Sequence, residues 1–151
     1  MKGAAGLTMR PAGIEDLDAV MVIEKQGFTT PWSRETLEKQ ITNPLALFLV
    51  SEKDDILTGF FLSWVLSDKV HLMKLAVRPD HRRRGIGRLL LAQSLEAARK
   101  RGGKIAFLEV RPSNREAVLF YRDSGFLPAG IQKGYYSDTS EDAIVMVKEI
   151  A

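Results

Sequence analysis

The chain has 151 residues, of which 45% are hydrophobic and 27% charged, and its net charge at neutral pH is +3. This length fits one domain with a conventional hydrophobic core. The chain contains no cysteine, which excludes disulfides, thiolate metal ligands and a cysteinyl acyl-enzyme, and agrees with a reducing, cytoplasmic environment. No apolar run reaches the roughly 18 to 20 residues that a membrane-spanning helix needs, so we expect no membrane span and no membrane partner.

The first half of the chain predicts two helices set among three strands. We expect residues 1–8 to form a short flexible extension without signal-peptide features, and residues 8–151 to form a single domain. The predicted strands cover residues 7–12, 45–52 and 56–66; the predicted helices cover residues 14–28 and the segment from a Ser33 cap to Ile41. The polar stretch Lys53-Asp54-Asp55 between the second and third strands predicts a hairpin.

The second half alternates strands and helices. We expect strands over 70–77, 104–110, 126–133 and 143–150, a helix over 85–101 that Gly102-Gly103 ends, and a helix to Gly125 opened by a Ser113–Glu116 capping box. A strand, a helix and a strand between residues 70 and 110 imply a right-handed crossover and a parallel strand pair. The pattern therefore predicts an α/β (α+β) fold, with a mixed but mostly antiparallel sheet and helices on both faces.

A basic turn joins the strand over residues 70–77 to the following helix. Glycines at positions 85 and 87 let the backbone approach a ligand, and the free amides at the helix start favour an anion. The arginines of this turn are Arg82, Arg83, Arg84 and Arg88. Guanidinium groups match phosphate oxygens, so a pyrophosphate would fit. The alternative is a tight turn with a solvated basic edge. The spacing matches neither the dinucleotide-binding nor the P-loop motif, which leaves coenzyme A as the next anionic candidate.

Several motifs follow one another in a characteristic order. They are Leu75-Ala76-Val77 before Arg82-x-x-Gly85-x-Gly87, then Leu108-Glu109-Val110-Arg111-x-Ser113-Asn114, then Phe120-Tyr121-x-x-x-Gly125-Phe126, and finally Tyr135-Tyr136 before Glu141-Asp142-Ala143. This order resembles the GNAT N-acetyltransferase superfamily. With Pro31-Trp32-Ser33, it is similar to the ribosomal-protein-alanine N-acetyltransferase subfamily over roughly residues 8 to 150.

The resemblance implies the GNAT fold and acetyl-CoA as co-substrate. That fold has about six to seven strands and four helices, and the parallel strands 70–77 and 104–110 splay apart to hold the pantetheine arm. Backbone groups of Leu75, Ala76 and Val77 would then bond the arm and polarise the thioester carbonyl. The resemblance assigns the remaining coenzyme contacts to Arg82, Arg83, Arg84, Gly85, Ile86, Gly87, Arg88, Asn114 and Tyr121. The run Arg82 to Arg84 is denser than the family's pyrophosphate signature needs, and the alternative is that it binds the 3′-phosphate of the coenzyme instead.

Two side chains match the family's proposed acid and base. Glu109 matches the general base, which takes a proton from the acceptor's ammonium group. Because an α-amine has a pKa near 7.7 to 8.0, roughly one chain end in ten is already neutral near pH 7, so this base is helpful rather than indispensable. Tyr121 matches the general acid that protonates the departing thiolate. The alternatives are a strand-end salt bridge between Glu109 and an arginine, and a core role for Tyr121 with Phe120 and Phe126.

On the acceptor side, the resemblance places Trp32, Tyr135 and Tyr136 at the rim of a peptide groove. The alternative for these three aromatics is a hydrophobic plug under a loop. Glu24, Asp138, Glu141 and Asp142 could hold an incoming ammonium group, although loop carboxylates are usually just solvated.

Three further residues bear on the site. His71 and His81 have no metal-ligand spacing, so we expect no metal and a structural or surface role for both. Lys74 stands where the subfamily more often has a small polar residue. A cation there, near the acceptor groove, would shift acceptor preference toward acidic or neutral peptide ends.

These features predict an enzyme that acetylates the N-terminal α-amine of a protein, a ribosomal protein beginning with alanine or serine by resemblance. Transfer would be direct, in a ternary complex. One alternative is the same chemistry on a lysine side chain or a small amine. Another is a basic RNA-binding or ribosome-associated module without turnover, but the sequence lacks the interleaved aromatic and basic residues of such surfaces, so we expect no direct nucleic-acid binding. The oligomeric state stays open.

Overall fold

A computed structural model describes residues 6–82 and 85–151. These residues form one seven-stranded sheet with the strand order β1-β2-β3-β4-β5-β7-β6. Its strands are β1 (Thr8–Pro11), β2 (Ala46–Lys53), β3 (Ile56–Leu66), β4 (Lys69–Val77), β5 (Ile105–Val110), β6 (Leu127–Gln132) and β7 (Ala143–Glu149). Neighbouring strands are antiparallel except for β4 and β5, which are parallel. The predicted mixed sheet is confirmed. Most of the expected N-terminal extension, residues 1–5, lies outside the described residues.

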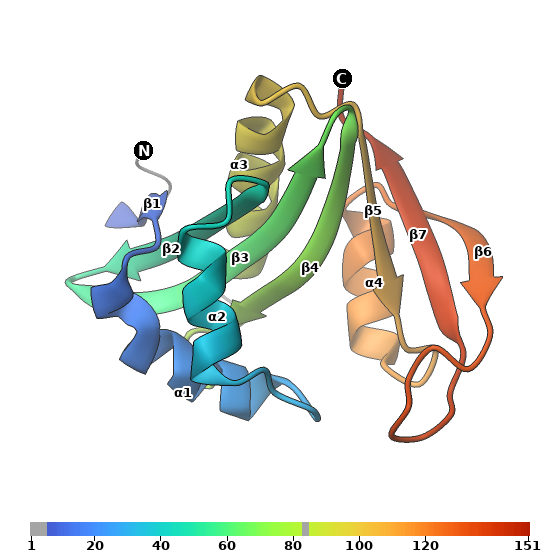
Figure 1. Cartoon of the computed structure of the whole chain (residues 1–151), viewed down its shortest axis with the longest axis horizontal. Coiled ribbons are helices and arrows are strands. Elements are labelled where there is room, and N and C mark those ends of the chain that lie inside the picture. The colour runs from blue at the N-terminus through green and yellow to red at the C-terminus, as the bar shows by residue number, and fades with distance from the viewer. Residues whose placement is uncertain (1–5, 83–84) are drawn as a thin grey trace.

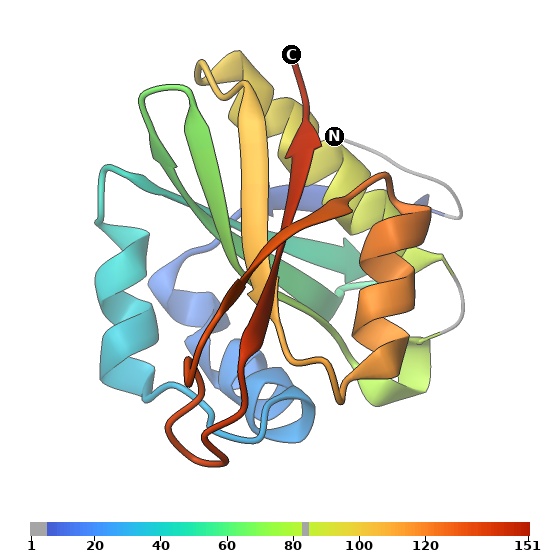
Figure 2. The same cartoon turned by 90° about the vertical axis from the view of Figure 1, so that its right-hand side faces the viewer.

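Helices cover both faces of the sheet, as predicted. They are α1 (Leu17–Gly27), α2 (Arg34–Ile41), α3 (Ile86–Lys100) and α4 (Arg115–Asp123), with short 3₁₀ turns at Ile14–Asp16 and Pro79–His81. Figures 1 and 2 show α1 and α2 on one face and α3 on the other, and α4 packs on the α3 side. Among the described helices, none is long and apolar enough to cross a membrane.

The two faces carry separate hydrophobic cores. Neighbouring residues of β3 show the division, because Phe60 packs with Leu17 of α1 whereas Phe61 packs with Leu90 of α3. All four side chains are 0% exposed. Successive side chains of a strand point to opposite faces, so a strand that is buried on both sides has an almost continuous apolar sequence, as β3 does.

The local turn and cap signals in the first half of the chain are confirmed. The β2–β3 hairpin turns through Asp54 and Asp55, whose φ angles are 52° and 64°. Two residues in the left-handed region give the turn twist that matches paired antiparallel strands, and aspartate tolerates that region better than most residues. Ser33 caps α2, because its Oγ accepts a hydrogen bond from the Thr36 amide at 3.1 Å.

The predicted Ser113–Glu116 capping box is wrong. The N-cap of α4 is Asn114, whose Oδ1 accepts a hydrogen bond from the Ala117 amide at 3.1 Å. The Ser113 hydroxyl instead donates to Glu141 Oε1 at 3.0 Å, and its amide donates to Glu141 Oε2 at 2.9 Å. Serine and asparagine are equally good caps, and a carboxylate 28 residues away engages the serine.

The parallel strands β4 and β5 splay apart, as predicted. Their pairing covers only residues 69–71 of β4 and residues 105–107 of β5. Beyond that point β4 stays with β3 and β5 stays with β7, and Figure 1 shows the two strands diverging.

A bulge accompanies the splay. Leu62 lies opposite Lys74 while the next residue, Ser63, lies opposite Leu72, so Met73 is an extra residue in β4. Met73 packs toward the α1 face, and Lys74 contacts Glu24 of α1. A bulge can re-aim side chains beside a functional site, and here it directs two consecutive side chains toward one face.

Candidate active site

The edge of β4 that faces β5 offers backbone groups to the gap between the two strands. The Arg78 amide donates to Thr58 O of β3 at 2.8 Å, and Val77 lies opposite Gly59. Backbone groups of successive strand residues point alternately to the two sides. Because of this alternation, the backbone N–H and C=O groups of Ala76 point toward β3, whereas those of Leu75 and Val77 point toward β5. Leu75 and Val77, rather than Ala76, are therefore the residues whose backbone could bond a ligand in the gap.

The basic turn leads directly to this edge. Arg82 donates from Nε to Val77 O at 3.1 Å. Arg83 and Arg84, which the sequence placed in the coenzyme site, lie outside the described residues.

The start of α3 has the features of an anion site. Gly85 is its N-cap, with a φ of 77° that disfavours other residues, and its oxygen accepts the Leu89 amide at 3.0 Å. Gly87 packs beside Val77, Ile86 is buried, and Arg88 is exposed. The first turn contains no acidic residue. It contains Arg88 instead. A positive side chain is unfavourable at the positive end of a helix dipole unless a bound anion offsets the repulsion.

Glu109 lies on β5 at the splay, with a histidine as its partner. Its Oε1 is 2.7 Å from His71 Nε2 of β4, and it also accepts a hydrogen bond from the Tyr135 hydroxyl at 3.3 Å. The Glu109 side chain is 12% exposed and that of His71 is 26% exposed. Among the described residues, the basic partner of Glu109 is therefore His71, and not an arginine as in the alternative interpretation.

Tyr121 lies on α4, half-buried between two phenylalanines. Its ring meets Phe120 and Phe126 edge-on, at centroid distances of 5.2 and 5.6 Å. Burial raises the pKa of the Tyr121 hydroxyl well above its ordinary value, and the neighbouring Tyr136 adds to the effect. The hydroxyl therefore keeps its proton at neutral pH, as a proton donor requires. Phe126 is 0% exposed and is a core residue, as predicted.

Two loops meet over the α1 face of the gap. The α1–α2 loop contributes Thr30, whose hydroxyl donates to Asp138 Oδ2 of the β6–β7 loop at 3.4 Å. Arg111, just past β5, donates to the same carboxylate oxygen at 2.8 Å and lies over the Tyr136 ring, 3.9 Å from its centroid. The Arg111 hydrogen bond lowers the pKa of Asp138. The Asp138 carboxylate is therefore already hydrogen-bonded to Arg111 and Thr30.

The loop aromatics occupy different environments within this region. Trp32 is half-buried in the α1–α2 loop, with its amide donating to Glu24 Oε2 at 2.7 Å. Tyr135 is 43% exposed, and its ring lies edge-on to Tyr136 at 4.9 Å. Burial raises the pKa of Tyr136 to about 12. All three lie in loops, as expected.

Lys74 is buried in an ion pair. Its Nζ lies 2.6 Å from Glu24 Oε2, and 4.0 and 4.4 Å from the ring centroids of Phe28 and Trp32. Burial lowers the pKa of Lys74, and the Glu24 contact partly offsets this. The Lys74 charge is therefore neutralised by Glu24, and does not stand free at the groove as the sequence suggested.

Two contacts were missed at the sequence level. His71 and Glu109 are 38 positions apart, and Lys74 and Glu24 are 50 positions apart. For His71 and Glu109, the only signal was that both residues lie on strands expected to be parallel neighbours, because the register places His71 opposite Phe107 and not opposite Glu109. His81 pairs with the adjacent Asp80 at 3.1 Å, and its side chain is 14% exposed.

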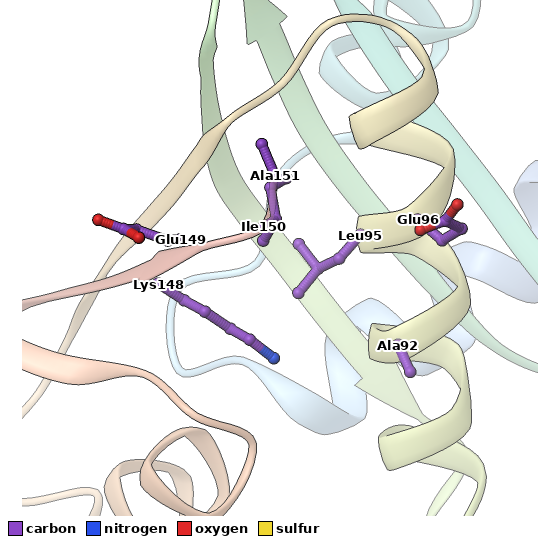
Figure 3. Close-up of a pocket in the computed structure, with 7 residues that line it drawn as sticks. All are labelled: Ala92, Leu95, Glu96, Lys148, Glu149, Ile150 and Ala151. Atoms are coloured by element: carbon purple, nitrogen blue, oxygen red, sulfur yellow. The ribbon is translucent and has the colours of Figure 1, made fainter.

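A shallow pocket elsewhere has no relation to this chemistry. Figure 3 shows it between α3 and the end of β7, lined by Ala92, Leu95, Glu96, Lys148, Glu149, Ile150 and Ala151. Glu149 of β7 lies opposite Ile105 of β5, and Ile105 lies opposite Lys69 of β4. The pocket therefore lies at the end of the sheet where β4 and β5 are paired. The described residues contain no cluster of three or more metal-ligating side chains.

Comparisons with known proteins agree with this geometry. The model of the acetyltransferase (GNAT) family matches residues 17–126. The ribosomal protein bS18-alanine N-acetyltransferase of Salmonella typhimurium is 37% identical over 139 residues, which cover 90% of this chain and 93% of that protein.

Solved structures show the same fold. The ribosomal-protein-S18-alanine N-acetyltransferase of Escherichia coli superposes with a TM-score of 0.87 at 33% identity, covering 96% of this chain and 94% of that one. An N-acetyltransferase of Thermoplasma acidophilum, solved with coenzyme A, has a TM-score of 0.80 at 24% identity. The match covers 95% of this chain and 99% of that one. The chain belongs to the acetyltransferase (GNAT) family, and within it is similar to the ribosomal-protein-alanine N-acetyltransferases.

Proposed function

We propose that this N-acetyltransferase transfers the acetyl group of acetyl-CoA directly to the N-terminal α-amine of a protein, in the cytoplasm. The acceptor class we propose is a ribosomal protein that begins with alanine or serine. The observation that carries this proposal is the splay of β4 and β5, with Glu109 at the gap between them. The names of the Salmonella and Escherichia coli relatives support the acceptor class.

The residues of the gap fit coenzyme A. Leu75 and Val77 would bond the pantetheine arm through their backbone, while the side chain of Ala76 lies toward α1. The amides of Gly85, Ile86, Gly87 and Arg88 would hold the pyrophosphate, with Arg82, Arg83 and Arg84 adding charge. The Asn114 oxygen is used by its own helix cap, so the side-chain NH₂ is the group that would reach the arm. Coenzyme A in the Thermoplasma acidophilum neighbour agrees with this ligand class.

Two side chains would move protons during transfer. Glu109 would accept a proton from the acceptor's ammonium group, so that the nitrogen lone pair can attack the thioester carbon. Hydrogen bonds from the β4 backbone would stabilise the charge that develops on the carbonyl oxygen. When the carbon–sulfur bond breaks, Tyr121 would donate its proton to the thiolate; its burial keeps that proton available.

The acceptor would enter on the α1 face, between the two loops that meet at Asp138. Trp32, Tyr135 and Tyr136 would contact its first residues. Tyr135 already bonds Glu109, which links this rim to the proposed base. Aromatic rings with one polar end suit a partly hydrated groove.

Direct transfer can be tested by intact-mass measurement and steady-state kinetics. The enzyme incubated with acetyl-CoA alone should gain no covalent acetyl group, and initial-rate plots against both substrates should intersect. A stable acetyl-enzyme that passes its acetyl group to a later-added peptide would refute the ternary-complex mechanism.

A further inference from the structure

We propose that His71 is a positioning residue for Glu109, and that the neutral form of His71 supports catalysis better than its charged form. The inference deepens the proposed function and rests on it, because Glu109 is the base there. His71 would donate from Nε2 to Glu109 Oε1 and so direct the other carboxylate oxygen toward the acceptor amine.

The contact is short and joins the two strands at the point where they part. His71 Nε2 and Glu109 Oε1 are 2.7 Å apart. His71 is the last residue of β4 that pairs with β5, opposite Phe107. Glu109 lies two positions beyond Phe107, and therefore on the same face of β5. The pair thus crosses the gap at its closed end.

Packing fixes the imidazole plane. The ring stacks on Phe107 at a centroid distance of 4.4 Å and an interplanar angle of 14°. On the other side, His71 lies opposite Trp64 of β3 in the strand register. A ring held in this way loses little further entropy when it donates to a carboxylate, so it can orient that carboxylate effectively.

The two oxygens of Glu109 are used differently. Oε1 receives both contacts, from His71 and from the Tyr135 hydroxyl at 3.3 Å. Among the described residues, no hydrogen-bond donor contacts Oε2. The carboxylate is therefore anchored at one oxygen and leaves the other for a substrate proton, an arrangement that a proton acceptor requires.

The charge of His71 acts on the basicity of Glu109. An imidazolium beside a carboxylate stabilises the anion and makes it a weaker base, whereas a neutral imidazole still orients it through its N–H. Histidine commonly changes charge between pH 5 and 8. The other titratable groups at this cluster are Tyr135 and Tyr136, whose pKa values are raised by burial. Both tyrosines therefore remain neutral in this pH range. The charged groups nearby are Arg111, which lies over the Tyr136 ring and pairs with Asp138, and the paired Lys74 and Glu24 along the same face.

The kinetic test compares His71→Gln, which keeps an N–H donor but cannot be charged, with His71→Phe, which keeps the stacking and loses the donor. We expect kcat of His71→Phe to fall about 10-fold at pH 7, with KM for acetyl-CoA unchanged, because losing the orienting hydrogen bond can cost as much as losing Glu109 itself but no more. His71→Gln should stay within about 3-fold of wild type at pH 7. The ratio of the kcat/KM of His71→Gln to that of wild type should fall as pH rises from 5.5 to 8.5, because glutamine, unlike histidine, carries no charge at any pH.

A matched control is His81→Gln. His81 is the second of the chain's two histidines and pairs with Asp80, not with Glu109. Its kcat/KM ratio to wild type should stay constant with pH. Equal losses in His71→Gln and His71→Phe, with a pH-independent ratio, would indicate a packing role and overturn the proposal. A wild-type kcat and pH profile in His71→Phe would overturn it as well. Thermal unfolding of each variant separates these outcomes from misfolding.

A second measurement needs no turnover. Long-range ¹H–¹⁵N spectra of the free enzyme report which imidazole nitrogen of neutral His71 carries the proton. We expect Nε2–H in wild type, and a changed Nε2 signal in Glu109→Gln. A proton on Nδ1 alone would overturn the proposal even if no acceptor is found. Absence of turnover with every acceptor, beside an Nε2–H tautomer, would instead refute the proposed function.

Discussion

The Lys74 ammonium group and the Glu24 carboxylate form a buried ion pair, 2.6 Å apart, with side chains that are 5% and 0% exposed. The pair joins the β4 bulge to α1. The same Glu24 oxygen accepts the Trp32 amide, so the pair also holds the α1–α2 loop. The second oxygen, Oε1, is buried and has no hydrogen-bond partner among residues 6–82 and 85–151. The pair therefore couples the strand at the proposed coenzyme site to a loop at the proposed acceptor site.

Removing one partner of this pair should be costly. Lys74→Met leaves the Glu24 carboxylate uncompensated in the core, so we expect the free energy of unfolding to fall by about 3–5 kcal/mol in urea titrations. Adding Glu24→Gln to Lys74→Met should recover a large part of that loss. The exposed Lys39–Glu35 pair is the control, and Lys39→Met should cost less than about 1 kcal/mol. A Lys74→Met variant as stable as Lys39→Met would contradict the role of the buried pair.

Glu109→Gln should slow the reaction most at low pH. We expect about a 10-fold lower kcat/KM for a peptide at pH 7, because roughly one acceptor α-amine in ten is already neutral there and can attack without a base. The loss should shrink toward pH 9, where most acceptor α-amines have already lost their proton. Pre-steady-state and steady-state rates across pH 6–9 measure this. Glu38→Gln, on the exposed surface of α2, should match wild type throughout. A pH-independent loss would argue against a base role.

Tyr121→Phe should lower kcat about 10- to 100-fold and weaken coenzyme A binding by less than about 3-fold, because the ring is kept and only the hydroxyl is removed. Burial raises the pKa of Tyr121, so the wild-type enzyme should show no loss of kcat from tyrosine ionisation up to about pH 9. Rate measurements from pH 7 to 9, with calorimetric titration of coenzyme A, check both statements. Full activity in Tyr121→Phe would assign the residue to core packing alone.

Arg88→Ala should weaken coenzyme A binding about 10-fold, because a phosphate contact at the start of α3 is lost. The weakening should be smaller at high salt. Arg99→Ala is the matched control at the other end of the same helix, where Arg99 pairs with Glu96 at 2.6 Å. Calorimetric titration of each variant with coenzyme A, at two salt concentrations, measures the difference in affinity. Equal affinities of the two variants would exclude Arg88 from the anion site.

Much of the fold could be predicted from the sequence because local signals agree with the final structure. Ser33, Gly85 and the Gly102-Gly103 pair mark helix ends where the structure has them, and Asp54-Asp55 forms the expected hairpin turn. The splayed strand pair was inferred from a family resemblance. The turn at Gly85 depends on local residues, so the sequence could locate it, whereas its binding of an anion stays a prediction.

The missed features depend on distant contacts. Ser113 looked like a helix cap, but Glu141 from the β6–β7 loop binds it and Asn114 caps the helix instead. The charge of Lys74 could not be assigned without knowing that the β4 bulge directs it toward α1. Strand periodicity alone does not reveal a bulge, because one extra residue changes which face every later side chain occupies.

The central claim, acetylation of a protein N-terminal α-amine, is tested most directly by thiol release and mass spectrometry on matched peptides. The panel contains a peptide beginning with alanine, one beginning with serine, the alanine peptide with a blocked N-terminus and an internal lysine, and free polyamines. The account predicts thiol release with the first two, and an added acetyl group only at the α-amine. Turnover of the blocked peptide or of polyamines alone would contradict it.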